Sequence, residues 1–451
     1  MANHATSPTT RFDTPTALAL EAAFDGGTLT ADGGLPWLAQ IDARMGLCEG
    51  LASCIVEWRR ATSLTHPLSD LVRQRVLQIA CGYEDQNDAD LLRSDPLLKL
   101  ACGRLPQTGG DLASQPTLSR LENAPDSRAC YRMAEALVEL YASQRGKAGA
   151  PSRVLLDFDS TDDPAHGEQE GVRYHGYFGQ HQYHPLLVFD GETGQIVAAV
   201  LRPGNAHAGA AALSVLKRIV ARLRKEWPEA RVEIRADAGF ALPAIYEWCE
   251  QQGVLYTIGL VPNARLEALA ERLSCVAKLT SVLRTRCGER PKVRFLSEAS
   301  YEAGSWGKER RVVYKAEVLE KGPNTRFVVT NRREPPRRLY DRYVERGETE
   351  NRIKDYKNAL RADRLSCCAF LANQFRLILH AAAYWLLDSL RERLVRGGVG
   401  RMQLDTLRLR VIKIGGRVRE SLRKVRLHLA SGHPGQRLWQ ALSRAQEGTR
   451  E

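Results

Sequence analysis

The sequence predicts an α/β protein whose sheet-containing core follows a helical N-terminal region. Three observations support this prediction. Apolar residues recur at helical spacing over most of residues 31–150, short apolar runs alternate with amphipathic segments after Pro151, and helical spacing returns at about residue 337. Such alternation of strand and helix signals is typical of α/β sheets. The length of 451 residues suggests about three domains.

The composition indicates a folded protein with an anionic partner. Hydrophobic residues make up 43% of the chain and charged residues 26%, which excludes a disordered polyelectrolyte. The formal net charge is +12. Because large basic chains usually bind polyanions, the charge favours a nucleic acid as partner. The alternative is a soluble enzyme that happens to be basic.

Cysteine usage and the first residues predict a cytoplasmic protein. The ten cysteines include no C-x-x-C pair, so we expect all of them to be reduced. The stretch MANHATSPTTRFD has no apolar segment of the kind found in secretory signals. The most apolar helix, residues 377–390, is short and contains His380 and Asp388. We therefore expect a buried helix and no membrane partner.

The N-terminal part predicts two segments. Residues 1–30 are rich in Thr, Ala and Pro and predict a flexible arm. Residues 31–150 predict a helical domain, since PLSDLVRQRVLQIACGYED and SRACYRMAEALVELYAS carry apolar residues at helical spacing. Loops containing Gly and Pro separate these helices.

Residues 151–262 predict the first part of the core. RVLLDFD predicts a strand, and residues 184–204 predict a hairpin around Gly191–Gly194. The helix AALSVLKRIVARLRKEW, the strand RVEIRADAGF, the helix LPAIYEWCEQQG and the strand LYTIGL follow. A meander followed by crossover units matches a ribonuclease-H-like core.

The rest of the chain predicts an insertion, a second part of the core and a basic region. Residues 263–325 predict a mostly β insertion, with Gly322–Asn324 as a turn between strands. Residues 326–395 predict the second, helical part of the core. Residues 396–451 predict a basic C-terminal region.

The C-terminal region alternates apolar and basic residues. Nine Lys or Arg occur between residues 401 and 426, against two acidic residues. This alternation predicts a sheet with one basic face, on which Arg417, Arg419 and Arg423 are candidate contacts to DNA phosphates. The alternative is a solvated edge strand that its charges protect from pairing.

Acidic residues lie at the ends of predicted elements. Asp157 and Asp159 share one face of the first strand, and Asp237 ends a later strand just before a helix. Such strand ends are where an α/β sheet places its site. Glu350 lies on a helix predicted from residue 343. We expect these carboxylates to meet at one edge of the sheet.

A carboxylate cluster repels itself unless a cation occupies it. Hard oxygen ligands suit Mg²⁺ or Mn²⁺. Two such ions about 4 Å apart activate a water molecule and stabilise the leaving oxygen of a phosphodiester. The sequence therefore predicts two Mg²⁺ ions, which Mn²⁺ can replace.

The stretch YVERGETENRIKDYK places polar residues on one helical stripe. Arg346, Glu350 and Lys357 lie 3, 7 and 14 residues after Tyr343, which at about 100° per residue confines all four to a stripe about 60° wide. Such a stripe normally holds apolar core residues. Arg346 and Lys357 are therefore candidates for gripping DNA phosphates, and Tyr343 for a phosphate hydrogen bond or for base stacking.

Simpler interpretations remain open. Arg346–Glu350 and Glu350–Lys354 are i,i+4 pairs, and each could be a surface ion pair worth about 0.3–0.5 kcal/mol. Asp162 and Asp163 predict a turn before a proline. Four histidines match no standard zinc spacing, which favours hydrogen-bonding or DNA-contact roles: His166, His175, His181 and His184.

The spacing Tyr343-x2-Arg346-x3-Glu350-x6-Lys357 resembles the Y-R-E-K signature of DDE transposases from bacterial insertion sequences. The blocks DFDSTDDPAHGEQEG, HPLLVFD, LRPGNAHAG and RADAGF precede it in order. Together the five blocks, within residues 110–395, look like the insertion-sequence 1380 family.

The resemblance implies a ribonuclease-H-like catalytic domain with a β-rich insertion between the second and third acidic residues. It carries the metal-binding DDE triad over to Asp159, Asp237 and Glu350, with Asp157 as the fallback for the first position. DNA-contact candidates on the helix are then Tyr343, Arg346, Lys354 and Lys357.

The resemblance further implies an enzyme that cuts donor DNA at terminal inverted repeats and joins the 3′-OH ends to a target. Residues 31–150 would recognise the repeats, and two copies would meet in a synaptic complex at the nucleoid. Relatives often form a hairpin on the element end, which the sequence leaves open here. The alternatives are a nuclease of the same fold that does not join ends, and a DNA-binding regulator without catalysis.

Overall fold

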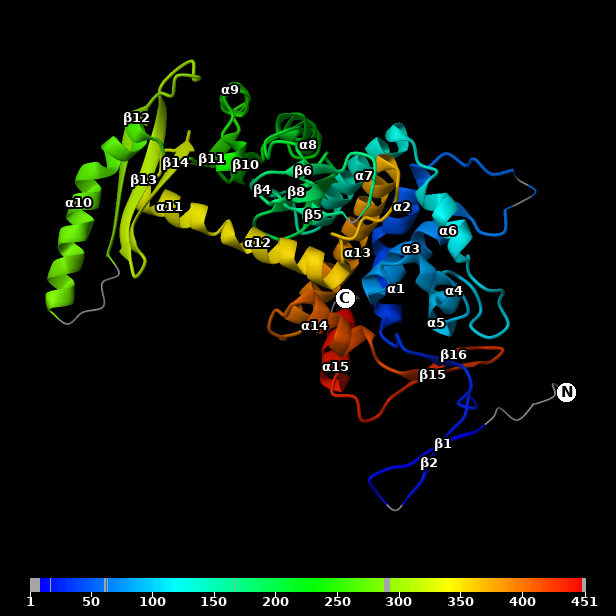
Figure 1. The fold of residues 1–451 in the computed structure, drawn as a ribbon. Coiled ribbons are helices and arrows are strands. Elements are labelled where there is room, and N and C mark those ends of the chain that lie inside the picture. Colours follow the sequence, from blue (N-terminus) through cyan, green and yellow to red (C-terminus); the bar gives the residue numbers. More distant parts are fainter. Residues whose placement is uncertain are drawn as a thin grey trace. The chain divides into compact units, whose positions relative to one another are not determined.

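The computed structural model describes residues 9–16, 18–60, 62, 64–165, 167–287 and 293–447 (Figure 1). The chain divides into two compact units, Met1–Leu121 with Leu386–Glu451, and Glu122–Trp385. The expected domain borders at residues 150 and 395 do not coincide with these units. The helix before residue 150 packs on the sheet of the second unit, and the C-terminal segment pairs with a strand of the first.

The second unit is built on an eight-stranded mixed sheet in the order β12-β13-β14-β11-β10-β4-β8-β9. In chain order, β4, β8 and β9 form an antiparallel meander. The next two strands, β10 and β11, run parallel to β4. The predicted meander with crossover units is therefore what the structure shows. These strands are β4 (Arg153–Ser160), β8 (Leu186–Asp190), β9 (Ile196–Val200), β10 (Arg231–Ala236) and β11 (Leu255–Leu260).

The two faces of this sheet differ in polarity. On one face Phe158, Ile234 and Ile258 pack with Leu216 and Ile245 of the crossover helices α8 (Ala212–Glu226) and α9 (Pro243–Gln251). Because side chains alternate along a strand, the opposite face receives the polar residues of β4 and β10. The remaining elements of this part are α7 (Ser127–Gly146), η3 (Ala238–Phe240), and the small sheet of β5 (Asp163–Pro164), β6 (Arg173–His175) and β7 (Gln180–Tyr183).

The insertion corrects two expectations. The insertion opens with a 23-residue helix, α10 (Ala264–Arg286), whereas mostly β structure was expected. The helix was not predicted because its apolar residues occupy more than one helical face. The turn expected at Gly322–Asn324 lies instead at residues 320–321, since Leu319 pairs with Gly322. Strands β12 (Val293–Tyr301), β13 (Arg310–Leu319) and β14 (Gly322–Thr330) extend the main sheet through β11.

A third correction concerns the turn expected at Asp162–Asp163. Asp163 and Pro164 form strand β5, and Asp163 pairs with Tyr183 of β7. A proline is accommodated because β5 is an edge strand.

The predicted helical part after residue 337 is interrupted. It consists of α11 (Pro336–Val344), α12 (Gly347–Lys354), the π-helical turn η4 (Asp355–Ala359) and α13 (Phe370–Arg396). The predicted buried helix at residues 377–390 lies in α13, where His380 and Asp388 are buried. Among the described residues, no helix has both the length and the hydropathy needed to cross a membrane.

The first unit is mainly helical and contains residues 31–121 of the segment for which a helical domain was expected. The expected flexible arm contains a two-stranded ribbon, and residues 29–30 pair with the C-terminal region. All ten cysteines of the chain are free. The elements are β1 (Thr10–Phe12), β2 (Leu20–Ala22), β3 (Leu29–Thr30), α1 (Leu35–Met45), α2 (Leu47–Ser53), α3 (Leu68–Cys81), η2 (Gln86–Asp88), α4 (Ala89–Leu92), α5 (Pro96–Ala101), α6 (Gln115–Glu122), α14 (Leu404–Leu407), η5 (Arg408–Ile412), β15 (Gly416–Glu420), β16 (Val425–Leu429) and α15 (Gln436–Glu447).

Candidate active site

Two aspartates lie side by side at the ends of neighbouring parallel strands. Phe158 of β4 is in register with Ala236 of β10, so Asp159 and Asp237 follow at the same level on the polar face. Asp159 is almost fully buried, and its Oδ1 accepts a hydrogen bond from its neighbour's amide at 2.9 Å. Asp237 caps η3, with Oδ1 accepting from the Gly239 amide at 2.9 Å.

The segment from residue 343 to 357 crosses these strand ends. The Tyr343 hydroxyl lies over Gly259 of β11, where any Cβ would come within 2.6 Å of the hydroxyl oxygen. Arg346 Nη1 donates to Asp159 Oδ2 at 3.0 Å. Lys357 Nζ donates to Asp162 Oδ1 at 2.7 Å, just beyond the end of β4. The interrupted helix thus keeps these side chains on the sheet side, and glycine at 259 provides the space for the phenol.

Glu350 comes from the same segment but is more exposed than its neighbours. Its side chain is 57% exposed, and its Oε1 lies 3.4 Å from Arg346 Nη2. The Arg346–Glu350 pair is therefore made, while Arg346 also holds Asp159. In the described part of the chain no ion pair joins Lys354 to Glu350, and Lys354 is exposed.

The electrostatics of Asp159 reflect all of these neighbours. Burial raises the pKa of Asp159 to about 7, Arg346 opposes this shift, and the charges of Asp237 and Glu350 add to it. Asp237 and Glu350 therefore both lie close enough to act on Asp159, which the Arg346 guanidinium contacts directly.

Asp157 has a different environment from Asp159. Its two oxygens accept from Arg235 Nε at 2.6 Å and Nη2 at 2.8 Å. The Thr349 hydroxyl donates to Oδ2 at 2.9 Å, and Arg352 Nη1 lies 3.7 Å away. Because Thr349 and Arg352 belong to α12, Asp157 anchors the helix that carries Glu350 onto the sheet.

Lys357 sits in a second acidic cluster. Its ammonium also donates to the Asp162 backbone oxygen at 2.9 Å and lies 3.9 Å from Asp363. Asp163 is buried nearby, and among the described residues neither of its carboxylate oxygens has a hydrogen-bond partner. Burial, followed by the charge of Asp363, raises the pKa of Asp163 well above its ordinary value.

The histidines contact backbone and aromatic rings. His184 Nδ1 lies 2.8 Å from the Ala206 oxygen, and burial lowers the pKa of His184 to about 4. Its ring lies 4.8 Å from that of His175, and the His181 ring lies 5.6 Å from Tyr174. His166 lies outside the described residues.

The basic face predicted for the C-terminal region is present on β15 and β16. Arg417 and Arg419 are exposed on either side of buried Val418. Arg419 lies directly opposite Arg426 across the hairpin. Arg423 is exposed in the connecting turn. Like charges directly opposite one another destabilise a sheet.

The ribbon is tied to the rest of its unit. Glu420 at the end of β15 accepts hydrogen bonds from the Gln107 amide at 2.7 Å and the Thr108 hydroxyl at 2.6 Å. At the other end of β15, Gly416 pairs with Thr30 of β3. The basic face is therefore held by contacts at both ends of β15.

Comparison with known proteins identifies the family. A family model described as transposase DDE domain group 1 matches residues 13–448. The chain belongs to this family. Among solved structures, the chain is similar to a piggyBac transposase synaptic complex with hairpin DNA, determined by cryo-EM, with 11% sequence identity, a TM-score of 0.41, and coverage of 85% of this chain and 79% of that chain. No curated protein matches.

DDE transposases generally use divalent metal ions, and the donor set of this DDE domain fits them in chemistry. Asp159, Asp237 and Glu350 supply carboxylate oxygens, which Mg²⁺ and Mn²⁺ prefer. Burial raises the pKa of Asp159, and the charges of Asp237 and Glu350 add to this shift although Arg346 opposes it. Within the residues that the structure describes, no group of three or more His, Cys, Asp or Glu side chains is arranged to hold a metal ion. Arg346 instead contacts both Asp159 and Glu350.

Sequence reasoning missed the residues that hold Asp157 and helix α12 in place. Arg235, Thr349 and Arg352 all bind Asp157, and the Arg352 guanidinium also donates to the Asp190 backbone oxygen at 2.9 Å. The available signal was Arg235, a charged residue on the same strand face as Asp237. A cation in a strand buried on both faces needs a partner on a neighbouring strand.

Proposed function

We propose that this chain is the transposase of a bacterial insertion sequence of the 1380 family, with the Y-R-E-K signature and a ribonuclease-H-like catalytic core. It binds terminal inverted repeats, cuts donor DNA by metal-dependent phosphodiester hydrolysis and joins the 3′-OH ends to target DNA. The proposal rests on one observation. Asp159 and Asp237 lie next to each other at the ends of adjacent strands, and the segment with Arg346 and Glu350 lies over them.

Asp159, Asp237 and Glu350 would hold two Mg²⁺ ions, or Mn²⁺ in their place. Bound ions of this kind supply an activated water molecule and stabilise the leaving oxygen. Without a metal ion, the Arg346 guanidinium contacts Asp159 and Glu350, two of the proposed ligands. On binding DNA its guanidinium exchanges these carboxylates for a phosphate, which it holds through paired hydrogen bonds.

The other residues of the segment contact DNA on either side of this centre. Tyr343 meets a phosphate or an unpaired base, and Lys357 and Lys354 meet backbone phosphates. Exposed Lys354 is available without rearrangement, whereas Lys357 first leaves Asp162.

Helices of residues 31–150, most of which lie in the first unit, read the terminal repeats, and Arg417, Arg419 and Arg423 hold the DNA backbone. Two copies assemble on two DNA ends in a synaptic complex at the nucleoid. The support for these roles is the exposed basic face of β15 and β16 and the net charge of +12.

A cleavage assay tests the proposal. DNA carrying the element's ends is incubated with Mg²⁺ and wild type, Glu350→Ala or the control Glu348→Ala. Both glutamates are exposed in the first turns of α12, so neither substitution disturbs the core. Wild type and control should cut at the repeat boundary, and Glu350→Ala should bind the ends without cutting.

The same assay separates the alternatives. Cutting without joining of 3′-OH ends to a target plasmid would indicate a nuclease. Binding of the ends by all three proteins without cutting would indicate a DNA-binding regulator. Equal cutting by wild type and Glu350→Ala would show that Glu350 is not an active-site residue.

A further inference from the structure

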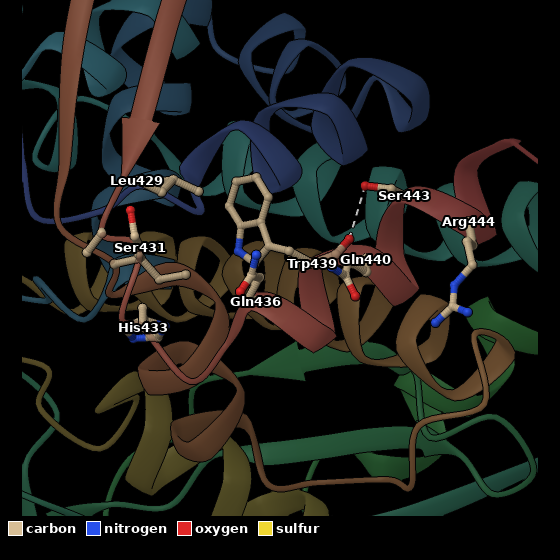
Figure 2. A pocket seen from close by; sticks show the side chains of 10 residues that line it. Leu429, Ser431, His433, Gln436, Trp439, Gln440, Ser443 and Arg444 are labelled. Atoms are coloured by element: carbon tan, nitrogen blue, oxygen red, sulfur yellow. Dashed lines mark hydrogen bonds between the residues drawn. The ribbon is translucent and has the colours of Figure 1, made fainter.

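A hollow of about 700 Å³ lies beside helix α15 in the first unit. Its volume is typical of small-molecule sites, which span about 300–1,000 Å³. Residues of α15 form one side of the hollow, and the end of β16 with the connection that follows forms the other (Figure 2). The residues that α15 contributes are Gln436, Trp439, Gln440, Ser443 and Arg444.

These five residues lie on one face of α15. At about 100° per residue they fall within an arc about 140° wide. Ala441 and Leu442, which are buried, lie on the opposite side of the helix. The polar residues that line the hollow therefore do not belong to the buried face of α15.

Trp439 presents a fixed aromatic ring at the hollow. Its Nε1 donates to the Val411 backbone oxygen at 3.2 Å, and its ring meets that of Trp37 edge-on, with 5.5 Å between the centroids. These contacts hold the ring in place, yet the residue stays half-exposed. An aromatic ring of this kind stacks well against the flat ring of a nucleobase.

Two glutamines supply hydrogen-bonding groups beside this ring. Gln436 and Gln440 are exposed and line the hollow, so their side-chain amides are available to a ligand. A side-chain amide carries donors and an acceptor, and it pairs with two atoms on the edge of a base. A base stacked on Trp439 would thus find partners for its edge.

The charge at the hollow favours an anion. Arg444 lines the hollow and is exposed, and none of the described lining residues is a carboxylate. A guanidinium holds a phosphate through two parallel hydrogen bonds. A phosphate ion alone would use Arg444 but neither the indole ring nor the amides.

We propose that this hollow binds a nucleotide, with its base stacked on Trp439 and its phosphate held by Arg444. The amides of Gln436 and Gln440 bind the edge of the base. The three kinds of side chain match the three parts of such a ligand. Two sources provide it: a free nucleotide, and an unpaired nucleotide of a DNA strand. The second source rests on the proposed function, whereas the first does not.

Titration calorimetry of the full chain tests this with three probes: AMP, adenosine and ribose 5-phosphate. Wild type should bind AMP more tightly than either of its parts. Arg444→Gln should weaken AMP binding by about tenfold or more and leave adenosine binding unchanged, because only the phosphate contact is lost. The control, Arg437→Gln, removes the same charge from an exposed position of α15 outside the hollow and should bind AMP as wild type does.

A second variant tests the base site without disturbing the core. Gln436→Ala/Gln440→Ala changes two exposed residues and should weaken binding of both AMP and adenosine, but not of ribose 5-phosphate. Failure of wild type to bind AMP, or AMP binding that either the Arg444 or the glutamine variant leaves unchanged, overturns the inference.

Competition with DNA identifies the source of the nucleotide. Bound AMP is challenged with a blunt duplex, or with the same duplex carrying a single-stranded 3′ overhang. Displacement by the overhang duplex alone assigns an unpaired nucleotide of DNA, and displacement by neither assigns a free nucleotide. Equal displacement by both would assign the hollow to the backbone of duplex DNA and overturn the inference. None of these assays involves cleavage, so a protein that binds AMP here but does not cut DNA keeps this inference and loses the proposed function.

Discussion

Asp157 of β4 and Arg235 of β10 form a buried two-point ion pair between neighbouring parallel strands. Two residues further along the same strand face, Asp159 faces a guanidinium from another segment and the carboxylate of Asp237. The first aspartate is thus engaged in structural contacts, and the second is the one that we propose as a metal ligand. This difference leads to the first prediction.

Asp157→Ala should destabilise the protein by about 3–5 kcal/mol, because it leaves Arg235 buried without its partner. It also releases Thr349 and Arg352 of α12. Asp159→Ala should leave the unfolding midpoint near that of wild type, since it removes a carboxylate whose charged form burial disfavours. Urea unfolding of both variants checks this. A greater loss of stability in Asp159→Ala would reverse the two assignments.

The pH dependence of the protein's stability should reflect the titration of the Asp159 carboxyl group. Its pKa is about 7 in the folded chain against 3.8 ordinarily, so between these values the folded state binds the proton more tightly. The metal-free protein should therefore lose stability as pH rises from about 4 to 7. The difference in melting temperature between wild type and Asp159→Asn, measured across that range, isolates this group. A difference that does not change with pH would contradict the raised pKa.

Arg346→Gln should separate metal binding from DNA cleavage. Without the guanidinium on Asp159 and Glu350, Mn²⁺ should bind the free protein more tightly, as titration calorimetry would show. Cleavage of the DNA ends should nevertheless fall, because the phosphate contact is lost. Lys357→Gln, in the neighbouring cluster, serves as the control for metal binding. Weaker Mn²⁺ binding by Arg346→Gln would show that the arginine supports the metal site and does not occupy it.

Reversing Arg417, Arg419 and Arg423 to glutamate should flatten the salt dependence of DNA binding. Each phosphate contact contributes about 0.9 to the slope of log affinity against log salt, so the slope should fall by up to about 3. The control reverses three basic residues on α8, Lys217, Arg218 and Lys225, and should keep the wild-type slope. Equal slopes for wild type and the ribbon variant would exclude a backbone contact at this face.

Local patterns predicted the elements whose residues follow a single period. The runs around Asp159 and Asp237 are buried strands, and the alternation around Arg417 and Arg419 gives an exposed basic face. In each case alternation or continuous apolarity is a property of the chain itself. The helix α10 was missed because its second apolar stripe obscures the amphipathic period.

The sequence by itself determined which residue types lie at the ends of the core strands, and the order in which these strands follow. It could not separate Asp157 from Asp159, since both lie on one face of one strand. That distinction was decided by the register between β4 and β10, which places Arg235 beside Asp157 and leaves Asp159 beside Asp237. Register is a relation between segments distant in the chain. Only the folded structure therefore shows which of the two carboxylates is held by the arginine of the neighbouring strand.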